Sequence, residues 1–243
     1  MVNLSKINLS IIVPTFNEEG GIRQTVSEIY QDLSRPSLKK IIDNFEVLVV
    51  DDGSWDKTSD ILKVLKKKYN FKLIKHRSNL GLGVSIITGI QHSTEGYITY
   101  LPADGQVFLR EITSGLKRAP YADLILTYRR ERIDYNPYRR ILSNTLTISM
   151  KLLFGLNYKD YNWVHIYKRD LFNHIKTKSK GVFYLGEIVA RTHQAGFKIL
   201  EAEVKYHPRS TGYSKNARLP VVFATLRDLI KLWVELKIRP LLS

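Results

Sequence analysis

The first hundred residues of the chain alternate between short apolar segments and longer segments whose apolar residues recur every three to four positions. In residues 18–33, Ile22, Val26, Ile29 and Leu33 share one face of an amphipathic helix. The short segments are apolar throughout, as strands buried on both faces of a sheet are. This alternation predicts an α/β fold, with a mainly parallel sheet and helices on both faces. The expected strands are residues 9–16, 45–52, 71–76 and 97–104, and the further expected helices are residues 59–69 and 83–93.

After about residue 120 the alternation becomes less regular. No segment rich in Pro, Gly or Ser divides the chain, and it contains no repeat. We expect one domain over residues 1–216 and a C-terminal amphipathic helix over residues 217–243, for contact with a membrane surface or in a dimer. The other expected elements are a strand that ends in a basic segment within residues 122–140, a helix in 139–156, a helix and a strand in 181–204, and a long helix in 219–242.

Composition narrows the class of protein. Of the 243 residues, 44% are hydrophobic, so the chain can bury a substantial core. Cysteine is absent, which excludes disulfides and Cys-based metal sites and suits a reducing cytosol. We expect no signal peptide, because the N-terminal apolar run LSIIV is short and is followed by Pro14 and Asn17. We expect no membrane-spanning helix, because no apolar run reaches roughly 18 residues. The formal net charge of +15 indicates an anionic partner: nucleic acid, a membrane surface or a phosphorylated small molecule.

Polar side chains follow three of the expected strands at the point where each strand ends. Ligands of parallel sheets bind at the carboxyl ends of the strands, so we expect these groups to converge on one edge. The residues are Asn17, Glu18, Asp51, Asp52, Asp104 and Gln106.

Two of these segments allow more than one interpretation. In VVDDGSWDKT, two adjacent carboxylates can accept hydrogen bonds from a nucleotide base or ribose, whereas Ser54 and Asp56 also suit a turn and a helix cap. In YLPADGQ, Asp104 and Gln106 can supply part of the oxygen shell of Mg²⁺, which takes its other ligands from phosphate and water. The alternative for YLPADGQ is an Asp-Gly turn with a solvated Gln.

Other segments give weaker signals. NLGLG, residues 79–83, lacks the further glycines of a dinucleotide-binding or P-loop enzyme and indicates a loop that passes close to a ligand or a neighbour. HPRSTGYSKN, residues 207–216, offers cationic groups for phosphate oxygens, or forms an exposed solvated loop. His165, His193 and His207 lack the spacing of a zinc site and are interpreted as structural or surface residues.

Taken together, these segments resemble the inverting GT-A (family 2) glycosyltransferases, particularly the branch of dolichyl-phosphate mannose synthase and the polyprenyl-phosphate glycosyltransferases. VLVVDDGSWDKT is similar to V-D-D-G-S-x-D-x-T, NLGLG to N-x-G-x-G, and YLPADGQ to D-A-D-G-Q. The resemblance runs in order over residues 9–216. Its other segments are SIIVPTFNEE, DLILTYRR, DYNWVHIYKRDLF and EIVARTHQAGFKILEAEVKYHPRSTGYSK.

The resemblance implies roles for individual residues. It implies Mg²⁺ or Mn²⁺ on the diphosphate of the donor. The implied residues are Pro14, Phe16, Glu18, Asp51 and Asp52 for the nucleotide; Asp104 and Gln106 for the metal; Arg129, Arg209, Ser214 and Lys215 for phosphates; and Asp104, Asp160 and Glu187 for catalysis.

The sequence departs from the family pattern at two places. Pro102 replaces the first Asp of D-A-D, which removes one possible metal ligand. The segment NWVHIY keeps little of T-S-G-F-R, so the acceptor is less well defined than the donor.

The resemblance implies an enzyme that moves a sugar from a GDP- or UDP-linked donor to a polyprenyl phosphate, with inversion, in the synthesis of cell-envelope polysaccharide. With the basic charge, it implies a cytoplasmic protein peripheral on the membrane, with a membrane-protein partner or a homo-oligomer as further possibilities. Two alternatives stay open: a saccharide hydroxyl as acceptor, which needs a base such as Asp160, and a non-catalytic nucleotide-sugar-binding protein. Nothing resembles an RNA- or DNA-binding module, so no nucleic-acid partner is expected.

Overall fold

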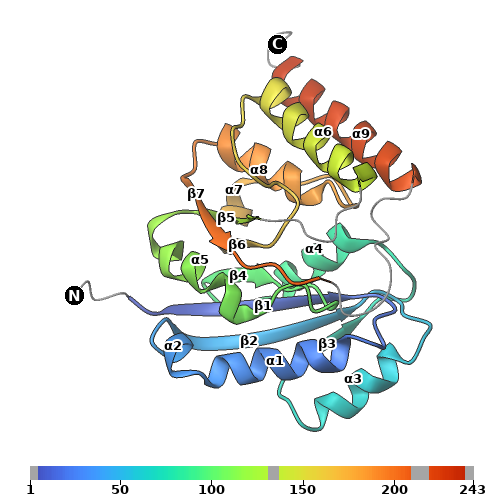
Figure 1. Cartoon of the computed structure of the whole chain (residues 1–243), viewed down its shortest axis with the longest axis vertical. Helices are drawn as coiled ribbons and strands as arrows, with labels where there is room; N and C mark the ends of the chain where they lie inside the picture. Colours follow the sequence, from blue (N-terminus) through green and yellow to red (C-terminus); the bar gives the residue numbers. More distant parts are fainter. Residues whose placement is uncertain (1–4, 131–136, 209–218, 239–243) are drawn as a thin grey trace.

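The computed structural model describes residues 5–130, 137–208 and 219–238, and its centre is a seven-stranded sheet (Figure 1). The strand order is β3-β2-β1-β4-β6-β5-β7. All neighbouring strands are parallel except where β6 pairs with β4 and β5. The strands are β1 (Ile7–Thr15), β2 (Ile42–Asp51), β3 (Lys72–Lys75), β4 (Tyr97–Tyr100), β5 (Leu124–Arg129), β6 (His165–Lys168) and β7 (Ile199–Val204). The predicted mainly parallel sheet is confirmed.

The helices follow the predicted alternation in the first half of the chain. They are α1 (Ile22–Ser34), α2 (Pro36–Lys39), α3 (Thr58–Lys66), α4 (Leu82–His92), α5 (Thr113–Arg118), α6 (Pro137–Phe154), α7 (Leu171–His174), α8 (Tyr184–Gln194) and α9 (Leu219–Trp233), with the short helical turns η1 (Leu109–Ile112), η2 (Ala119–Tyr121) and η4 (Val234–Ile238), the last of them π-helical. Every residue from 9 to 15 of β1 is buried, as expected for a central strand covered on both faces.

The register of the parallel strands sets the position of their carboxyl ends. Thr15 of β1 lies opposite Asp51 of β2, and the Asp52 N–H donates to the Thr15 carbonyl at 2.8 Å. On the other side of β1, the Leu101 N–H, just after β4, donates to the Ile12 carbonyl at 2.8 Å. The loops after β1, β2 and β4 therefore leave the sheet at one edge, as the sequence predicted.

The antiparallel strand β6 was not predicted. It has only four residues, in the segment DYNWVHIYKRDLF, where aromatic and polar side chains hide any apolar period. Its place between β4 and β5 comes from pairing with both neighbours rather than from its own pattern.

Helices α6 and α9 lie together at the end of the molecule remote from β2 and α1 (Figure 1). Their predicted positions are confirmed, although the end of the predicted last helix, residues 239–242, lies outside the described residues. Leu229 and Leu232 of α9 are buried. No helix among the described residues is long and apolar enough to cross a bilayer. The expected domain boundary at residue 216 also lies outside the described residues and stays a prediction.

Candidate functional site

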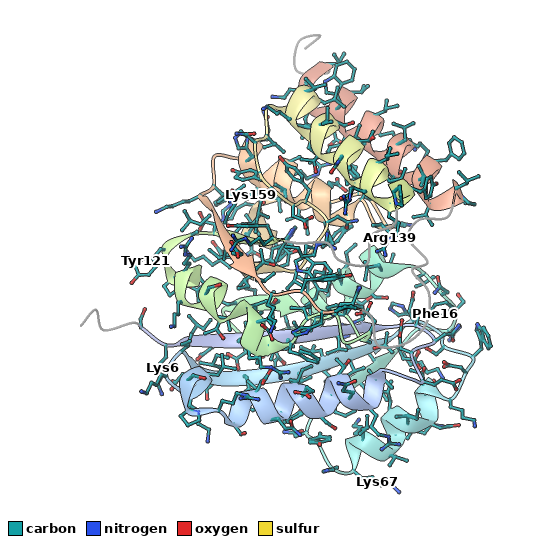
Figure 2. The ribbon with its side chains drawn as sticks, viewed as in Figure 1. Lys6, Phe16, Lys67, Tyr121, Arg139 and Lys159 are labelled. Atoms are coloured by element: carbon teal, nitrogen blue, oxygen red, sulfur yellow. The ribbon has the colours of Figure 1, made fainter. Side chains whose placement is uncertain are left out.

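A cavity of about 530 Å³ lies at the carboxyl ends of β1, β2 and β4. Figure 2 labels Phe16 at this edge. Three groups of residues line the cavity: the strand-end loops, the segment from residue 79 into α4, and a wall formed by residues 181–183 with α9. They are Pro14, Thr15, Phe16, Glu18, Asp52, Asn79, Gly81, Leu82, Ser85, Pro102, Ala103, Asp104, Gly181, Val182, Phe183, Pro220, Val221, Ala224, Thr225 and Asp228.

The loops after β1 and β2 are joined by hydrogen bonds between side chains and backbone. Asn17, which has a positive φ of 51°, donates its N–H to Ser54 Oγ at 3.0 Å, and its Oδ1 accepts the N–H of Trp55 at 3.0 Å. The N–H of Glu18 donates to Thr58 Oγ1 at 2.9 Å, and Asp56 Oδ1 accepts the Thr58 N–H at 2.9 Å. Ser54 and Asp56 thus take part in turns, whereas the N-cap position of α3 is Lys57, which makes no side-chain cap bond. These turns fix the loop that contains Phe16, which lines the cavity.

The adjacent acids Asp51 and Asp52 are both buried but have different contacts. Asp51 accepts the N–H of Ser54 at 2.9 Å and the hydroxyl of Ser59, and it is not among the described residues that line the cavity. Asp52 lines the cavity and holds the following loop through the N–H groups of Leu80 at 2.9 Å and Gly81 at 2.8 Å. A buried carboxylate needs such donors to offset the loss of water.

Asp104 and Gln106 lie on the loop after β4. Asp104 lines the cavity, and its Oδ1 accepts the Gln106 N–H at 3.1 Å. Gln106 Nε2 donates to the Tyr206 hydroxyl at 2.7 Å, and this side chain is not among the described residues that line the cavity. The two residues predicted as metal ligands therefore differ in position: Asp104 lines the cavity, whereas the Gln106 amide binds a tyrosine.

Arg129, at the end of β5, forms a buried ion pair with Asp160. Its Nε and Nη2 lie 2.9 and 2.8 Å from Asp160 Oδ2, and the guanidinium lies 4.1 Å from the ring centre of Trp163. Removing one member of such a pair leaves an uncompensated buried charge, so each side chain holds the other in place. The contacts of Asp160 suit a structural ion pair better than a general base.

Glu187, on α8, accepts hydrogen bonds from the loop before that helix. Its carboxylate takes the N–H groups of Lys178, at 3.0 and 3.1 Å to its two oxygens, and of Ser179 at 2.6 Å. Arg191 Nε donates to Glu187 at 2.7 Å, and its guanidinium also reaches Glu235 of η4 at 3.2 Å. These contacts fix the backbone that leads into the cavity wall at residues 181–183.

Glu235 completes this network. Burial raises the pKa of Glu235, but the hydrogen bond from Lys178 and the charge and hydrogen bond of Arg191 outweigh it, so the pKa lies below its usual value. Lys178 Nζ lies 2.9 Å from Glu235 Oε1. The C-terminal helical segment is thereby ionically attached to the loop before α8.

His165 is buried in β6, as the structural interpretation of the sequence predicted. Burial lowers its pKa to about 4, although the charge of Asp160 acts in the opposite direction. Its Nδ1 lies 3.1 Å from the Tyr167 hydroxyl. The ring is therefore neutral at pH 7 and belongs to the core.

Some predicted site residues can be located and others cannot. Pro14, Phe16 and Glu18 line the cavity, as do Asp52 and Asp104. Glu187 and Arg129 lie in ion-pair networks instead. Arg209, Ser214 and Lys215 lie outside the described residues, and their roles stay predictions.

The cavity wall formed by α9 and residues 181–183 was not predicted from the sequence. The glycines of NLGLG gave a partial signal, because a Cβ on Gly83 would lie 2.6 Å from the Lys180 carbonyl oxygen. The Val84 N–H donates to that same oxygen at 3.3 Å. The prediction of close approach to a neighbour is confirmed here, but no local pattern showed that the neighbour lies about a hundred residues later.

Asp104 lines the cavity and is the type of residue that binds Mg²⁺ or Mn²⁺ through oxygen. The described residues contain no group of three or more His, Asp or Glu side chains that could hold a metal ion. A Mg²⁺ or Mn²⁺ ion that shares a diphosphate needs only one or two protein oxygens, a number that a single acid such as Asp104 can provide. The site fits a cation that binds together with a phosphorylated ligand.

Comparison with known proteins decides the family. The model of Glycosyl transferase family 2 matches residues 10–178. The chain belongs to glycosyl transferase family 2. A solved structure of glucosyl-3-phosphoglycerate synthase from Mycobacterium tuberculosis, in complex with Mn²⁺, UDP and glucosyl-3-phosphoglycerate, matches with a TM-score of 0.69 at 14% identity, over 94% of this chain and 79% of that chain. The predicted GT-A fold is confirmed.

Three relatives of this family 2 chain have names that include a prenyl phosphate. An undecaprenyl-phosphate mannosyltransferase of Micrococcus luteus is 26% identical over 84% of this chain and 85% of its own length. A dolichyl-phosphate beta-glucosyltransferase of Trichomonas vaginalis is 30% identical over 57% of this chain, and an undecaprenyl-phosphate 4-deoxy-4-formamido-L-arabinose transferase of Pectobacterium carotovorum is 25% identical over 88%. The chain spans 46% and 64% of the lengths of these last two.

The contact at Gly83 gives a testable prediction. In Gly83→Ala the new Cβ would lie 2.6 Å from the backbone oxygen of Lys180 and 2.8 Å from that of Gly181. Backbone oxygens cannot move away as easily as the end of a flexible side chain. We expect overpacking to outweigh the gain in helix propensity, with a net loss of about 1–2 kcal/mol in the free energy of unfolding, measured in urea. Gly96→Ala is the control, because nothing lies within 4 Å of its Cβ. Equal stability of the two variants would contradict the contact.

Proposed function

We propose that this protein is an inverting glycosyltransferase that moves a sugar from a GDP- or UDP-linked donor to a polyprenyl phosphate at the membrane surface. The observation that carries the proposal is the composition of the cavity. One side consists of strand-end loops that include Asp104, and the other is a wall from α9. Apolar residues of α9 are exposed, including Phe223 at 67% and Leu226 at 51%. A polar donor site thus adjoins a surface suited to lipid.

The donor nucleotide is assigned to the strand-end side of the cavity. Pro14, Phe16 and Glu18 are proposed to border the base and ribose, with Asp52 near the ribose. Asp51 is proposed to act through the Ser54 turn that it holds, since its carboxylate already accepts hydrogen bonds from that turn. The same loops also exclude water from one side of the donor.

The diphosphate is assigned to the neighbourhood of Asp104, with Mg²⁺ or Mn²⁺. Such a cation, when bound, neutralises charge on the departing nucleoside diphosphate. Asp104 would hold the ion, and Gln106 would support the loop through its own bond to Tyr206. Arg129, Arg209, Ser214 and Lys215 remain the proposed contacts of the phosphates.

A phosphate acceptor agrees with the ion pairs of Asp160 and Glu187, because such an acceptor needs little help from a catalytic base. A phosphate monoester is largely ionised at neutral pH, because its second pKa is about 6, and so it needs little help from a base. One of its oxygens forms the new bond to the anomeric carbon opposite the leaving group, and the bond from that carbon to the diphosphate oxygen breaks with its electron pair. Attack from the opposite side inverts the anomeric centre. Asp160 and Glu187, which are engaged in ion pairs, are then proposed to position backbone and Arg groups.

The membrane surface is proposed to contact α6 and α9. Anionic lipids attract Lys and Arg by about 1 kcal/mol each near the surface, and apolar side chains add to this by burial in the interface. Basic residues of the two helices include Arg140, Lys151 and Lys231. The exposed apolar residues are Tyr138, Ile141, Ile148 and Leu152 of α6 and Leu219, Phe223, Leu226 and Ile230 of α9. We place the protein on the cytoplasmic face, where a membrane-protein partner or a second copy could also be present.

The proposed reaction is tested by transfer of labelled sugar from GDP-mannose, UDP-glucose or UDP-N-acetylglucosamine to undecaprenyl phosphate, with Mn²⁺ or Mg²⁺. One donor should give a product that needs the cation. Asp104→Asn should lower the rate about 100-fold, because it removes the proposed cation ligand. Asp60→Asn, on the exposed face of α3, is the matched control and should retain activity. Transfer to free saccharides but never to the prenyl phosphate would contradict the proposed acceptor.

The membrane contact is tested by sedimentation with vesicles of phosphatidylglycerol and phosphatidylcholine. Phe223→Ser should weaken binding about tenfold, as expected for loss of a large apolar side chain buried in lipid. Added salt should weaken it further by screening the basic residues. Val64→Ser replaces an apolar residue of α3 with a similar exposure of 54% and serves as control. If both variants bind as the unaltered protein does, the proposed face is wrong.

A further inference from the structure

A second cleft, of about 680 Å³, lies between the loop before α8, helix α8 and the C-terminal segment formed by α9 and η4. Its walls therefore come from separate parts of the chain. Its lining residues are Lys178, Ser179, Lys180, Gly181, Glu187, Arg191, Ala224, Arg227, Asp228, Ile230, Lys231, Leu232, Val234 and Glu235.

The acidic groups of this cleft are already neutralised. Glu187 lies 2.7 Å from Arg191, and Glu235 lies 2.9 Å from Lys178 and 3.2 Å from Arg191. The remaining acid, Asp228, lies 2.9 Å from Arg227, the residue before it in α9. These ion pairs engage three of the five cationic side chains that line the cleft.

Two lysines remain. Within the described parts of the chain, neither Lys180 nor Lys231 forms an ion pair, and both are exposed. They come from different elements, since Lys180 lies in the loop before α8 and Lys231 in α9. The cleft thus carries two ammonium groups whose charge no carboxylate of its own lining offsets. Such a cleft attracts an anion.

The position of the cleft indicates what kind of anion it takes. Gly181, Ala224 and Asp228 line both this cleft and the first cavity, so the two adjoin. Ile230 also lines the cleft and is 48% exposed, on the same helix as the exposed Leu226. A ligand with an anionic head and an apolar chain therefore satisfies both kinds of surface.

We propose that the second cleft binds the phosphate head of an amphiphile, with Lys180 and Lys231 as its cationic contacts and the exposed face of α9 beside its chain. Two sources share this chemistry: a prenyl phosphate that waits beside the cavity, and a membrane phospholipid. Assignment of the cleft to a prenyl phosphate rests on the proposed function, whereas binding of a phosphate head group by the cleft does not depend on it. The site lies apart from Asp104, which is not among its lining residues.

The experiment is calorimetric titration of the full chain with farnesyl phosphate, dihexanoyl phosphatidic acid and inorganic phosphate, without donor or cation. Lys180→Gln and Lys231→Gln should each weaken binding of an amphiphile about fivefold, and the double variant more than tenfold. Lys66→Gln, at an exposed lysine of α3 for which no ion pair is found among the described residues, is the matched control and should bind unchanged. Circular dichroism checks that each variant is folded.

The three probes separate the sources. A loss in the double variant for farnesyl phosphate alone assigns the cleft to a prenyl phosphate, and an equal loss for both amphiphiles assigns it to phosphate-headed lipids in general. Unchanged binding of both amphiphiles by the double variant overturns the proposal, as does an equal loss in Lys66→Gln. Inorganic phosphate should bind at least about tenfold more weakly than the amphiphiles, and equal affinity would overturn the role of the apolar chain. Since no turnover is measured, a failed transfer reaction leaves these results interpretable.

Discussion

The parallel register of β1 with β2 and β4 determines where the strand-end side of the site lies. Backbone hydrogen bonds from Asp52 to Thr15 and from Leu101 to Ile12 fix where the three strands end. A slip of one residue would move every side chain of a strand to the other face of the sheet. Because the strands are buried on both faces, their ends are among the few places where polar groups can collect beside a ligand. The strand-end side of the cavity follows from that geometry.

Buried carboxylates then shape the loops around the cavity. Asp52 holds the N–H groups before α4, and Glu187 holds those before α8. The two loops meet where the Lys180 carbonyl contacts Gly83 and Val84. Each acid is buried at a cost that its hydrogen bonds offset, so the loops it binds are held in one arrangement. Asp104 also lines the cavity, and its Oδ1 holds the N–H of Gln106 in its own loop.

The sequence predicted what depends on local pattern. The apolar runs placed β1, β2 and β4, and the polar residues after them predicted that Glu18, Asp52 and Asp104 converge on one edge of the sheet. The pattern could not predict that α9 forms a wall, because residues 220–228 share the cavity with strand-end loops that precede them by more than a hundred residues. It also gave no sign that Asp160 is paired with Arg129, since both lie in loops or strand ends whose approach is decided by the pairing of β5 with β6.

A nucleoside diphosphate and a cation are proposed to occupy the strand-end cavity rather than the basic cleft beside it. The sharpest test is amide hydrogen exchange measured by mass spectrometry with UDP and with GDP, each with Mn²⁺. We predict slower exchange in residues 16–19, 103–106 and 181–183 with one of the two nucleotides. Protection confined to the second cleft, in residues 227–235, would contradict the proposal, as would no change in the three strand-end and wall segments with either nucleotide.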